Sequence, residues 1–216
     1  MIDEVAGIRT ETFQRPNPQW VEALRGTPTG FLCDAMGGDG ALDLRLRPAV
    51  AGQFAFCGVA LTCDAGPADN LALLHALAAV QPGDVIVAAT GGYTGCAITG
   101  DLVLGMARNA GAVGFVTDGC VRDLVGVRKV GLPAWCMGVT PNSPHRNGPG
   151  TVGGPIHLAG RRVTAGDVVV ADEDGVVVVP QGRIEAVLAR LPAIRTAEAA
   201  ADETVRQGAT RPGFLK

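Results

Sequence analysis

The sequence has little charge and few aromatic side chains. Charged residues make up 18% of the 216 residues, aromatic residues make up 4%, and the formal net charge is −3. Proteins that bind nucleic acid usually carry a basic excess and aromatic platforms for the bases. We therefore expect no nucleic-acid partner. The sparse charge also indicates that other protein subunits cover part of the surface, so we expect a homo-oligomer.

Long apolar runs are missing as well. No run approaches the roughly 18 residues of a membrane-spanning helix, so we expect no membrane partner. The first residues, MIDEVAGIRTETF, are acidic and polar, unlike a secretory signal peptide. These features predict a cytoplasmic protein. Apolar residues make up 47% of the chain, which is enough for the core of one domain or of two small ones.

Several catalytic signatures are absent. Ser143 is the only serine and lies between prolines, so a Ser/His/Asp triad has almost no support. The glycine-rich segment GGYTG at 91–95 is not followed by the GK[ST] of a phosphate-binding loop. The three histidines are not spaced near the cysteines as zinc ligands would be. Cysteines occur at six positions without a CxxC pair, and we expect them to be reduced, buried small residues: Cys33, Cys57, Cys63, Cys96, Cys120 and Cys136.

The order of the predicted elements favours a mixed α/β fold. Up to about residue 140, helical segments alternate with short apolar strands, whereas 152–180 reads as hairpins and 181–208 as a helix. Thr27 or Thr29 is a plausible helix cap, and Pro192 predicts a kink or break. The acidic segment 171–175, ADEDG, is better explained as a hairpin turn than as a metal site.

The predicted helix and strand bring three charged residues to one edge of the sheet. The helix 102–110 spans about 14 Å, and the strand 112–117 returns roughly 20 Å. This path brings Asp101 to the same sheet edge as the adjacent pair Arg122–Asp123. Ligands of α/β sheets bind beyond the carboxyl ends of strands, so this edge is the candidate site.

The chemistry of these groups suits a small anion and a divalent cation. The free N–H groups of Leu102 and Val103 at the start of the helix could hold a carboxylate. Asp101 and Asp123 could hold the cation, and Arg122 could bind an oxyanion. Structural alternatives remain, because Asp101 is also well placed as a helix N-cap and Arg122–Asp123 could be a surface ion pair.

Two stretches, 100-GDLVLGMARNAGAVGFVTDGCVRD-123 and 166-GDVVVADEDGVVVVP-180, resemble the RraA-like family. That family includes class II pyruvate aldolases, which act on 4-hydroxy-4-methyl-2-oxoglutarate and 4-carboxy-4-hydroxy-2-oxoadipate, and the regulator of ribonuclease E. The resemblance covers roughly residues 25–208. It implies a three-layer β/β/α sandwich, a single domain over 1–216 with a C-terminal helical extension at 181–216, and a homotrimer or homohexamer.

The resemblance also implies a role for each matching residue. Asp123 would help to hold Mg²⁺ or Mn²⁺, and Arg122 would contact the keto oxygen of the substrate. Asp101 would support the water shell of the metal. A C-terminal glutamate would reach the site of a neighbouring subunit, with Glu198 favoured over Glu203. Substrate-binding groups are implied at four positions: Gly100, Leu102, Val103 and Arg122.

The implied activity is metal-dependent retro-aldol cleavage of a 4-hydroxy-2-oxo diacid that releases pyruvate, with oxaloacetate decarboxylation as a side activity. No lysine lies in the motif to form a Schiff base, since the only lysines are Lys129 and Lys216. Two alternatives remain: a non-catalytic regulator that binds ribonuclease E, and a related lyase or decarboxylase acting on another 2-oxo acid. The presence of the C-terminal extension favours the enzyme, because the regulators of the family are shorter.

Overall fold

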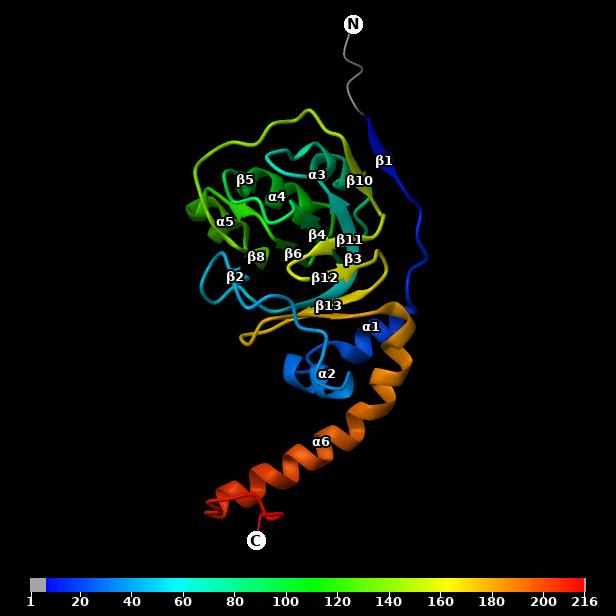
Figure 1. Ribbon diagram of the computed structural model, residues 1–216, viewed down its shortest axis with the longest axis vertical. Coiled ribbons are helices and arrows are strands. Elements are labelled where there is room, and N and C mark those ends of the chain that lie inside the picture. The colour runs from blue at the N-terminus through cyan, green and yellow to red at the C-terminus, as the bar shows by residue number, and fades with distance from the viewer. Residues whose placement is uncertain (1–6, 216) are drawn as a thin grey trace, which may run out of the picture.

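Four parallel strands form the centre of the protein (Figure 1). In this computed structural model, which describes residues 7–215, they lie in the order β3-β4-β6-β8 within a nine-stranded sheet. Their bounds are Phe56–Asp64, Asp84–Ala89, Gly114–Thr117 and Ala134–Cys136. The other five strands of this sheet are β1 (Ile8–Thr10), β2 (Arg47–Pro48), β10 (Gly150–Val152), β13 (Val168–Ala171) and β14 (Val176–Val179).

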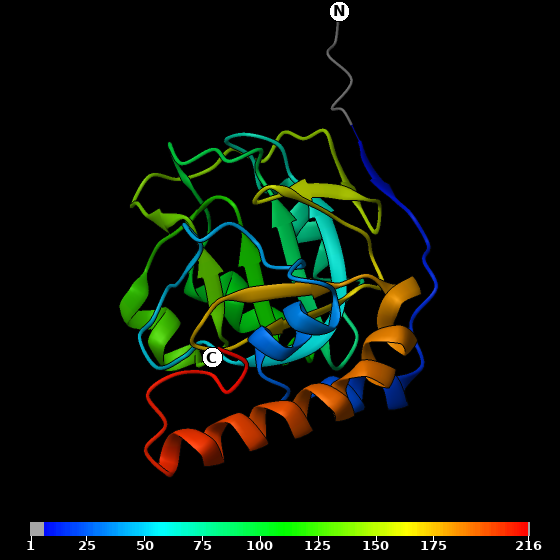
Figure 2. The ribbon, with the colours of Figure 1, turned by 60° about the horizontal axis from the view of Figure 1, so that its bottom comes forward.

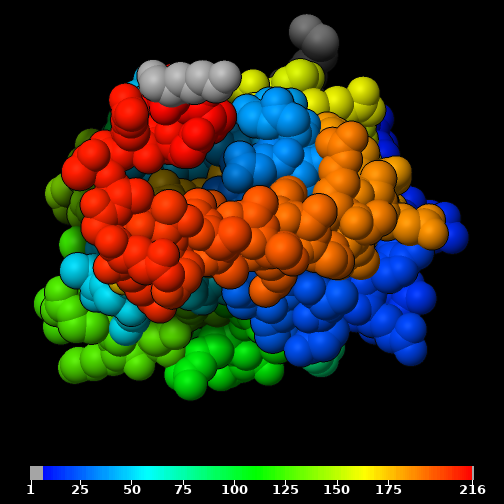
Figure 3. Space-filling model, turned by 90° about the horizontal axis from the view of Figure 1, so that it is seen from below, coloured from blue at the N-terminus to red at the C-terminus, as the bar shows by residue number. Residues whose placement is uncertain are grey.

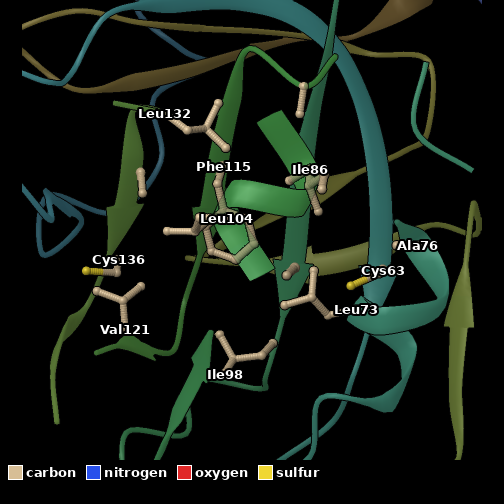
Figure 4. Close-up of a cluster of buried hydrophobic side chains, with 14 of the residues drawn as sticks. Cys63, Leu73, Ala76, Ile86, Ile98, Leu104, Phe115, Val121, Leu132 and Cys136 are labelled. Atoms are coloured by element: carbon tan, nitrogen blue, oxygen red, sulfur yellow. The ribbon is translucent and has the colours of Figure 1, made fainter. Parts of the chain in front are cut away.

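Helices cover one face of the central strands. They are α3 (Leu71–Ala76), α4 (Asp101–Asn109) and α5 (Leu124–Val130). Strand β4 is buried on both faces because its side chains alternate between two clusters: Ile86 packs with Leu73 and Leu104 beneath these helices, whereas Val85 and Val87 face the other side. Figure 4 shows Ile86 among Phe115, Leu104 and Leu73.

A second β layer covers the opposite face. It contains the separate hairpin β11 (Ile156–Leu158) and β12 (Arg161–Val163), and the valine-rich hairpin β13–β14, which pairs with β3 in the nine-stranded sheet and packs over the central strands. In β13, Val169 packs toward the central sheet, whereas Val168 and Val170 pack against the terminal helices. The mixed α/β class with layered sheets and helices is therefore confirmed, and ADEDG is the turn of the β13–β14 hairpin.

The terminal helices form a further layer on the β13–β14 hairpin. They are α1 (Pro18–Leu24), α2 (Thr29–Ala35) and α6 (Ile184–Arg206), with a short 3₁₀ helix (Gln181–Arg183) before α6. Figures 2 and 3 show α6 lying across this face of the molecule, next to α1 and α2. Only the first part of α6 is anchored, since its buried residues are Ile184, Val187 and Leu191.

One local prediction is wrong and another is wrong in part. Pro192, predicted as a kink or break, lies inside α6 and does not break the helix, which continues to Arg206. Figures 1 and 2 show that α6 nevertheless bends along its length. The N-cap of α2 is Pro28, and Thr29 is the first helical residue; its N–H and hydroxyl both donate to the Asp172 carboxylate, at 2.7 Å each. No helix among residues 7–215 is long and apolar enough to span a membrane.

Candidate active site

Three short parallel strands end at one place. They form a separate sheet in the order β5 (Ala97–Thr99), β7 (Cys120–Val121) and β9 (Gly138–Val139). The chain leaves β5 into Gly100 and Asp101, leaves β7 into Arg122 and Asp123, and leaves β9 into a loop that carries Ser143. The sequence predicted that the strand 112–117 leads directly to the charged pair. The strands that lead into the site are instead β7 and β5, which are too short to give a recognisable pattern in the sequence.

A cavity of about 210 Å³ lies where these strands end. Residues 97–103 and the pair Arg122–Asp123 line it, together with Asn70 and three residues of the loop after β9: Ser143, Pro144 and Arg146. The structure thus brings together six of the seven predicted site residues: Gly100, Asp101, Leu102, Val103, Arg122 and Asp123.

Two glycines leave room for the two carboxylates. Asp123 begins α5 in a left-handed conformation (φ 58°), and a Cβ atom at Gly100 would overlap its carboxylate. A Cβ atom at Gly126, in α5, would overlap the carboxylate of Asp101, in α4. Each carboxylate therefore occupies space that a glycine at the start of the other helix leaves free. The close packing of α4 and α5 depends on these two positions.

Arg122 is held from two sides. Its Nε lies 3.2 Å from Asp123 Oδ2, and its Nη1 lies 2.6 Å from Ser143 Oγ. The backbone N–H of Arg122 donates to Thr99 O at 3.0 Å. The side chain is 35% exposed, so its guanidinium is constrained by these partners and still accessible from the solvent.

The loop that carries Ser143 is fastened on both sides of this residue. Asn142 O accepts from Ala97 N at 2.9 Å, and Asn142 Nδ2 donates to Gly95 O at 3.0 Å. His145 N donates to Ala68 O at 2.7 Å. Ser143 is therefore a fixed partner of Arg122 despite its place in an irregular segment. From the sequence, Ser143 was considered only as a nucleophile, and its contact with Arg122 was not predicted.

The start of α4 differs from the prediction in one respect. The N-cap is Gly100, and Asp101 is the first helical residue, with its Oδ1 accepting from Leu102 N at 2.8 Å. The amide of Leu102 is thus already paired with a carboxylate. By helix geometry the N–H of Val103 also has no partner within the helix, so an anion in the cavity can use this amide directly.

Lys129 lies closer to the site than the sequence indicated. It borders a shallow hollow on the outer side of α5 together with Asp101 and Asp123, but it is exposed and does not line the cavity itself. A lysine that forms a Schiff base is usually desolvated, which lowers its pKa. The position of Lys129 does not provide this environment. Lys216 lies outside the described residues.

Glu198 is not brought to the cavity of its own chain. It lies in the exposed second half of α6, beyond Arg195, whose Nη2 donates to Thr27 Oγ1 at 2.8 Å. Glu203 is also exposed and accepts from Gln207 Nε2 at 2.8 Å. Neither glutamate lines the cavity. Neither glutamate is therefore placed to act at the cavity of its own chain.

The cysteines provide no nucleophile for the site. All six are free thiols, and five are buried, whereas Cys33 is half-buried. Burial raises the pKa of the Cys120 thiol, which disfavours the reactive thiolate. Cys120 Sγ instead contacts Thr94 O at 3.6 Å, as a small packing residue beside the charged pair.

The residues of the cavity fit a hard divalent cation. Asp101 and Asp123 supply carboxylate oxygens at one cavity, and Mg²⁺ is commonly held by one or two carboxylates with waters completing its shell. Among residues 7–215 there is no group of three or more His, Cys, Asp or Glu side chains that could enclose a metal ion. An ion at this site would therefore keep positions open for water and substrate.

Comparison with known proteins gives the family. A sequence profile of the RraA-like family, described as Aldolase/RraA, matches residues 29–178. The chain belongs to the RraA-like family. It is 37% identical over 169 residues to a Halalkalibacterium halodurans protein named "Putative 4-hydroxy-4-methyl-2-oxoglutarate aldolase", covering 78% of this chain and 80% of that one.

Two solved structures share the fold. One is an uncharacterized protein from Pseudomonas syringae pv. tomato, with a TM-score of 0.78, 27% identity and coverage of 92% of this chain and 97% of that chain. The other is Streptomyces coelicolor RraAS2, described as an unusual member of the RNase ES inhibitor RraA protein family, with a TM-score of 0.78, 28% identity and coverage of 88% and 99%. The predicted RraA-like fold is confirmed.

Proposed function

We propose that this protein is a divalent-metal-dependent carbon–carbon lyase. It cleaves a 4-hydroxy-2-oxo diacid to release pyruvate, and it decarboxylates oxaloacetate as a second activity. The observation that carries the proposal is the meeting of Asp101, Arg122 and Asp123 at one cavity beside the start of α4. The name of the Halalkalibacterium halodurans relative supports the same reaction class.

Both reactions pass through the enolate of pyruvate, whose negatively charged oxygen must be stabilised. In the retro-aldol reaction the C4 hydroxyl loses its proton to water and C4 becomes a carbonyl carbon, whereas in the decarboxylation C4 leaves as CO₂. In both reactions the electron pair of the C3–C4 bond stays on the pyruvate fragment, whose keto oxygen is an enolate oxygen until C3 takes up a proton. Arg122 donates hydrogen bonds to this oxygen as its charge develops. The amide of Val103 binds the C1 carboxylate at the positive end of α4. A bound Mg²⁺ or Mn²⁺, held by Asp123 with Asp101 orienting its waters, would supply Lewis-acid stabilisation of the keto oxygen.

We also propose that the working form is a homotrimer or a homohexamer. The second half of α6 extends past the body of the chain (Figure 1). Glu198 lies in this half and is exposed to solvent. An isolated helix arm of this kind has no packing of its own, whereas a second subunit would cover it. In that assembly Glu198 would complete the cavity of a neighbouring subunit.

A pyruvate-release assay tests the activity. Purified protein with Mg²⁺ or Mn²⁺ should release pyruvate from a 4-hydroxy-2-oxo diacid and from oxaloacetate, and EDTA should abolish both reactions. Asp123→Asn should be inactive, whereas Asp174→Asn, which alters an exposed acid in the β13–β14 turn, should behave like the unaltered protein. Full activity in EDTA would rule out the metal mechanism.

Borohydride trapping tests the competing Schiff-base route. Incubation with pyruvate and sodium borohydride should leave the intact mass unchanged, because Lys129 is outside the cavity. A covalent adduct on Lys129 would show that the reaction proceeds through an imine instead.

A second candidate function is regulation of a ribonuclease. The match to RraAS2 favours it, because 88% coverage of this chain must include part of the extension 181–216. The extension alone therefore does not separate enzymes from regulators. Inhibition of an RNase E-type nuclease by both the unaltered protein and Asp123→Asn, with no pyruvate release by either, would establish the regulator.

A further inference from the structure

A second arginine lies at the open side of the cavity. Arg146 lines the cavity from the loop after β9 and is exposed, whereas Ile98 and Thr99 in the wall of the same cavity are 2% and 3% exposed. Within the described part of the chain, no carboxylate lies within ion-pair distance of its guanidinium. Arg122 differs, because Asp123 already holds it at 3.2 Å. The charge of Arg146 is therefore available to an anionic ligand.

The backbone on both sides of Arg146 is fixed. The buried carboxylate of Asp69, which is 8% exposed, accepts from Asn147 N at 2.6 Å. On the other side, His145 forms an isolated β-bridge with Asp69, and His145 N donates to Ala68 O at 2.7 Å. The Cα atom of Arg146 thus has a fixed position beside the cavity, so that only its side chain has to become ordered when a ligand binds.

The proposed substrate has one charged group that still lacks a partner. Its C1 carboxylate is assigned to the amide of Val103 and its keto oxygen to Arg122, at the start of α4. A 4-hydroxy-2-oxo diacid carries a second carboxylate on C4. This end of the molecule extends toward the open side of the cavity, where Arg146 lies, because buried residues close the inner side. A guanidinium suits this group, since it can donate two parallel hydrogen bonds to one carboxylate.

The charges of the cavity and of the substrate also match. A single divalent cation would neutralise Asp101 and Asp123, which leaves the positive charges of Arg122 and Arg146 among the lining residues. These two charges balance the two carboxylates of a diacid. A 2-oxo acid with only one carboxylate would leave one guanidinium without a counter-charge, and such a difference in electrostatic complementarity gives specificity.

We infer that Arg146 binds the second carboxylate of the substrate and thereby selects 2-oxo diacids over 2-oxo monoacids. This inference rests on the proposed function. The second carboxylate keeps its charge during retro-aldol cleavage and leaves with the second product. Arg146 therefore binds the substrate and the transition state equally well, which lowers KM and leaves kcat unchanged.

Two 2-oxo acids of equal chain length provide the test. 2-Oxoglutarate carries a second carboxylate at the position where 2-oxopentanoate has a methyl group, and neither has the C4 hydroxyl that retro-aldol cleavage requires. Calorimetry with Mg²⁺ present measures both dissociation constants without turnover. The unaltered protein should bind 2-oxoglutarate about tenfold or more tightly, the effect of hydrogen bonds between charged groups. Arg146→Ala should lose this preference, whereas its affinity for 2-oxopentanoate should change less than about twofold.

Two further variants serve as controls. Arg146→Lys retains the positive charge and should keep most of the preference for 2-oxoglutarate. Arg162→Ala removes an exposed arginine of β12 that does not line the cavity, and it should leave both affinities unchanged. In the pyruvate-release assay, Arg146→Ala should raise KM for the 4-hydroxy-2-oxo diacid about tenfold or more at unchanged kcat.

Two results would overturn the inference. An equal loss of affinity for both acids in Arg146→Ala would show that this residue supports the cavity as a whole. Equal binding of the two acids by the unaltered protein, or binding of neither, would show that no site for a second carboxylate exists. A failure of the proposed function is recognised separately: the unaltered protein would then prefer 2-oxoglutarate through Arg146 but release no pyruvate from any substrate.

Discussion

Ser143 Oγ lies 2.6 Å from Nη1 of Arg122, while Asp123 holds Nε of the same guanidinium at 3.2 Å. A charged group with two fixed partners has one preferred orientation, and hydrogen bonds to charged groups contribute about 1.5–3 kcal/mol. Ser143→Ala should therefore lower kcat about tenfold or more, because a misoriented donor stabilises the enolate oxygen poorly. KM should change little, and Ser143→Thr, which retains the hydroxyl, should restore most of the rate.

A double-mutant cycle separates positioning from a direct role. If Ser143 acts through Arg122, adding Ser143→Ala to Arg122→Ala should cost nothing further. A further tenfold loss in the double variant would show that Ser143 contacts the substrate independently of the guanidinium.

Three charged residues of the site could be predicted from the sequence, but their polar neighbours could not. The lengths of the predicted helix 102–110 and strand 112–117 were enough to place Asp101 beside the pair Arg122–Asp123, although the strand that leads into the pair is β7. Ser143 and Asn70 reach the same cavity from irregular segments. Their contacts join positions 21 and 28 residues apart in sequence, and no local periodicity encodes such contacts.

The secondary-structure elements also divide into those that the sequence predicted and those that it did not. The strongly patterned elements, such as β6 and α4, appear where the sequence predicted them. The helix α5 was missed because LVGVRKV combines β-branched residues with Gly126, all of which are poor helix formers. Its formation depends on tertiary packing against α4, in particular on Val127, which is fully buried.

Gly126 should matter for activity more than for stability. Alanine is favoured over glycine inside a helix by about 1 kcal/mol, yet a Cβ atom at this position would overlap the Asp101 carboxylate. Gly126→Ala should therefore displace Asp101 and lower kcat/KM on the order of 10²-fold, as expected for a small misplacement at a site. Thermal unfolding and pyruvate release measured on the same preparation check both parts.

Gly105 is the matched control for this substitution. It lies in α4, and a Cβ atom there would make only an ordinary contact of 3.7 Å with Val130. Gly105→Ala should retain full activity and gain roughly 0.5–1 kcal/mol of stability. Full activity in Gly126→Ala would instead show that the position of Asp101 is not critical.

Buried thiols should make the protein sensitive to alkaline pH. Burial raises the pKa of Cys57 and of Cys136 from 9.0 to about 11. Because the folded-state pKa lies above the unfolded-state value, the stability from these protonated thiols is complete below pH 9 and is lost as the pH rises to about 11. The loss is on the order of 3 kcal/mol for each thiol.

Denaturant unfolding between pH 8 and pH 11 measures this effect. Cys57→Ala should flatten the decline relative to the unaltered protein, whereas Cys33→Ala, at a half-buried position, should change it less. An identical slope for Cys57→Ala and the unaltered protein would assign the alkaline decline to other groups.

Mixed assemblies test whether Glu198 serves a neighbouring subunit. Glu198 lies on the projecting half of α6 and does not line the cavity that contains Arg122 and Asp123 of its own chain. Asp123→Asn and Glu198→Gln should each be inactive alone. Co-expressed subunits should regain activity, because an intact cavity can then meet an intact Glu198 in about a quarter of the sites of a random equal mixture.

The control pairs two substitutions in the same cavity. Asp123→Asn co-expressed with Arg122→Ala should stay inactive, since no subunit then has a complete cavity. Glu203→Gln should retain activity if Glu198 is the glutamate that reaches across. Activity that is retained in Glu198→Gln alone would remove this residue from the mechanism. Inactive mixtures of Asp123→Asn and Glu198→Gln would instead place both side chains in one subunit's site, and α6 would then have to fold back toward its own cavity.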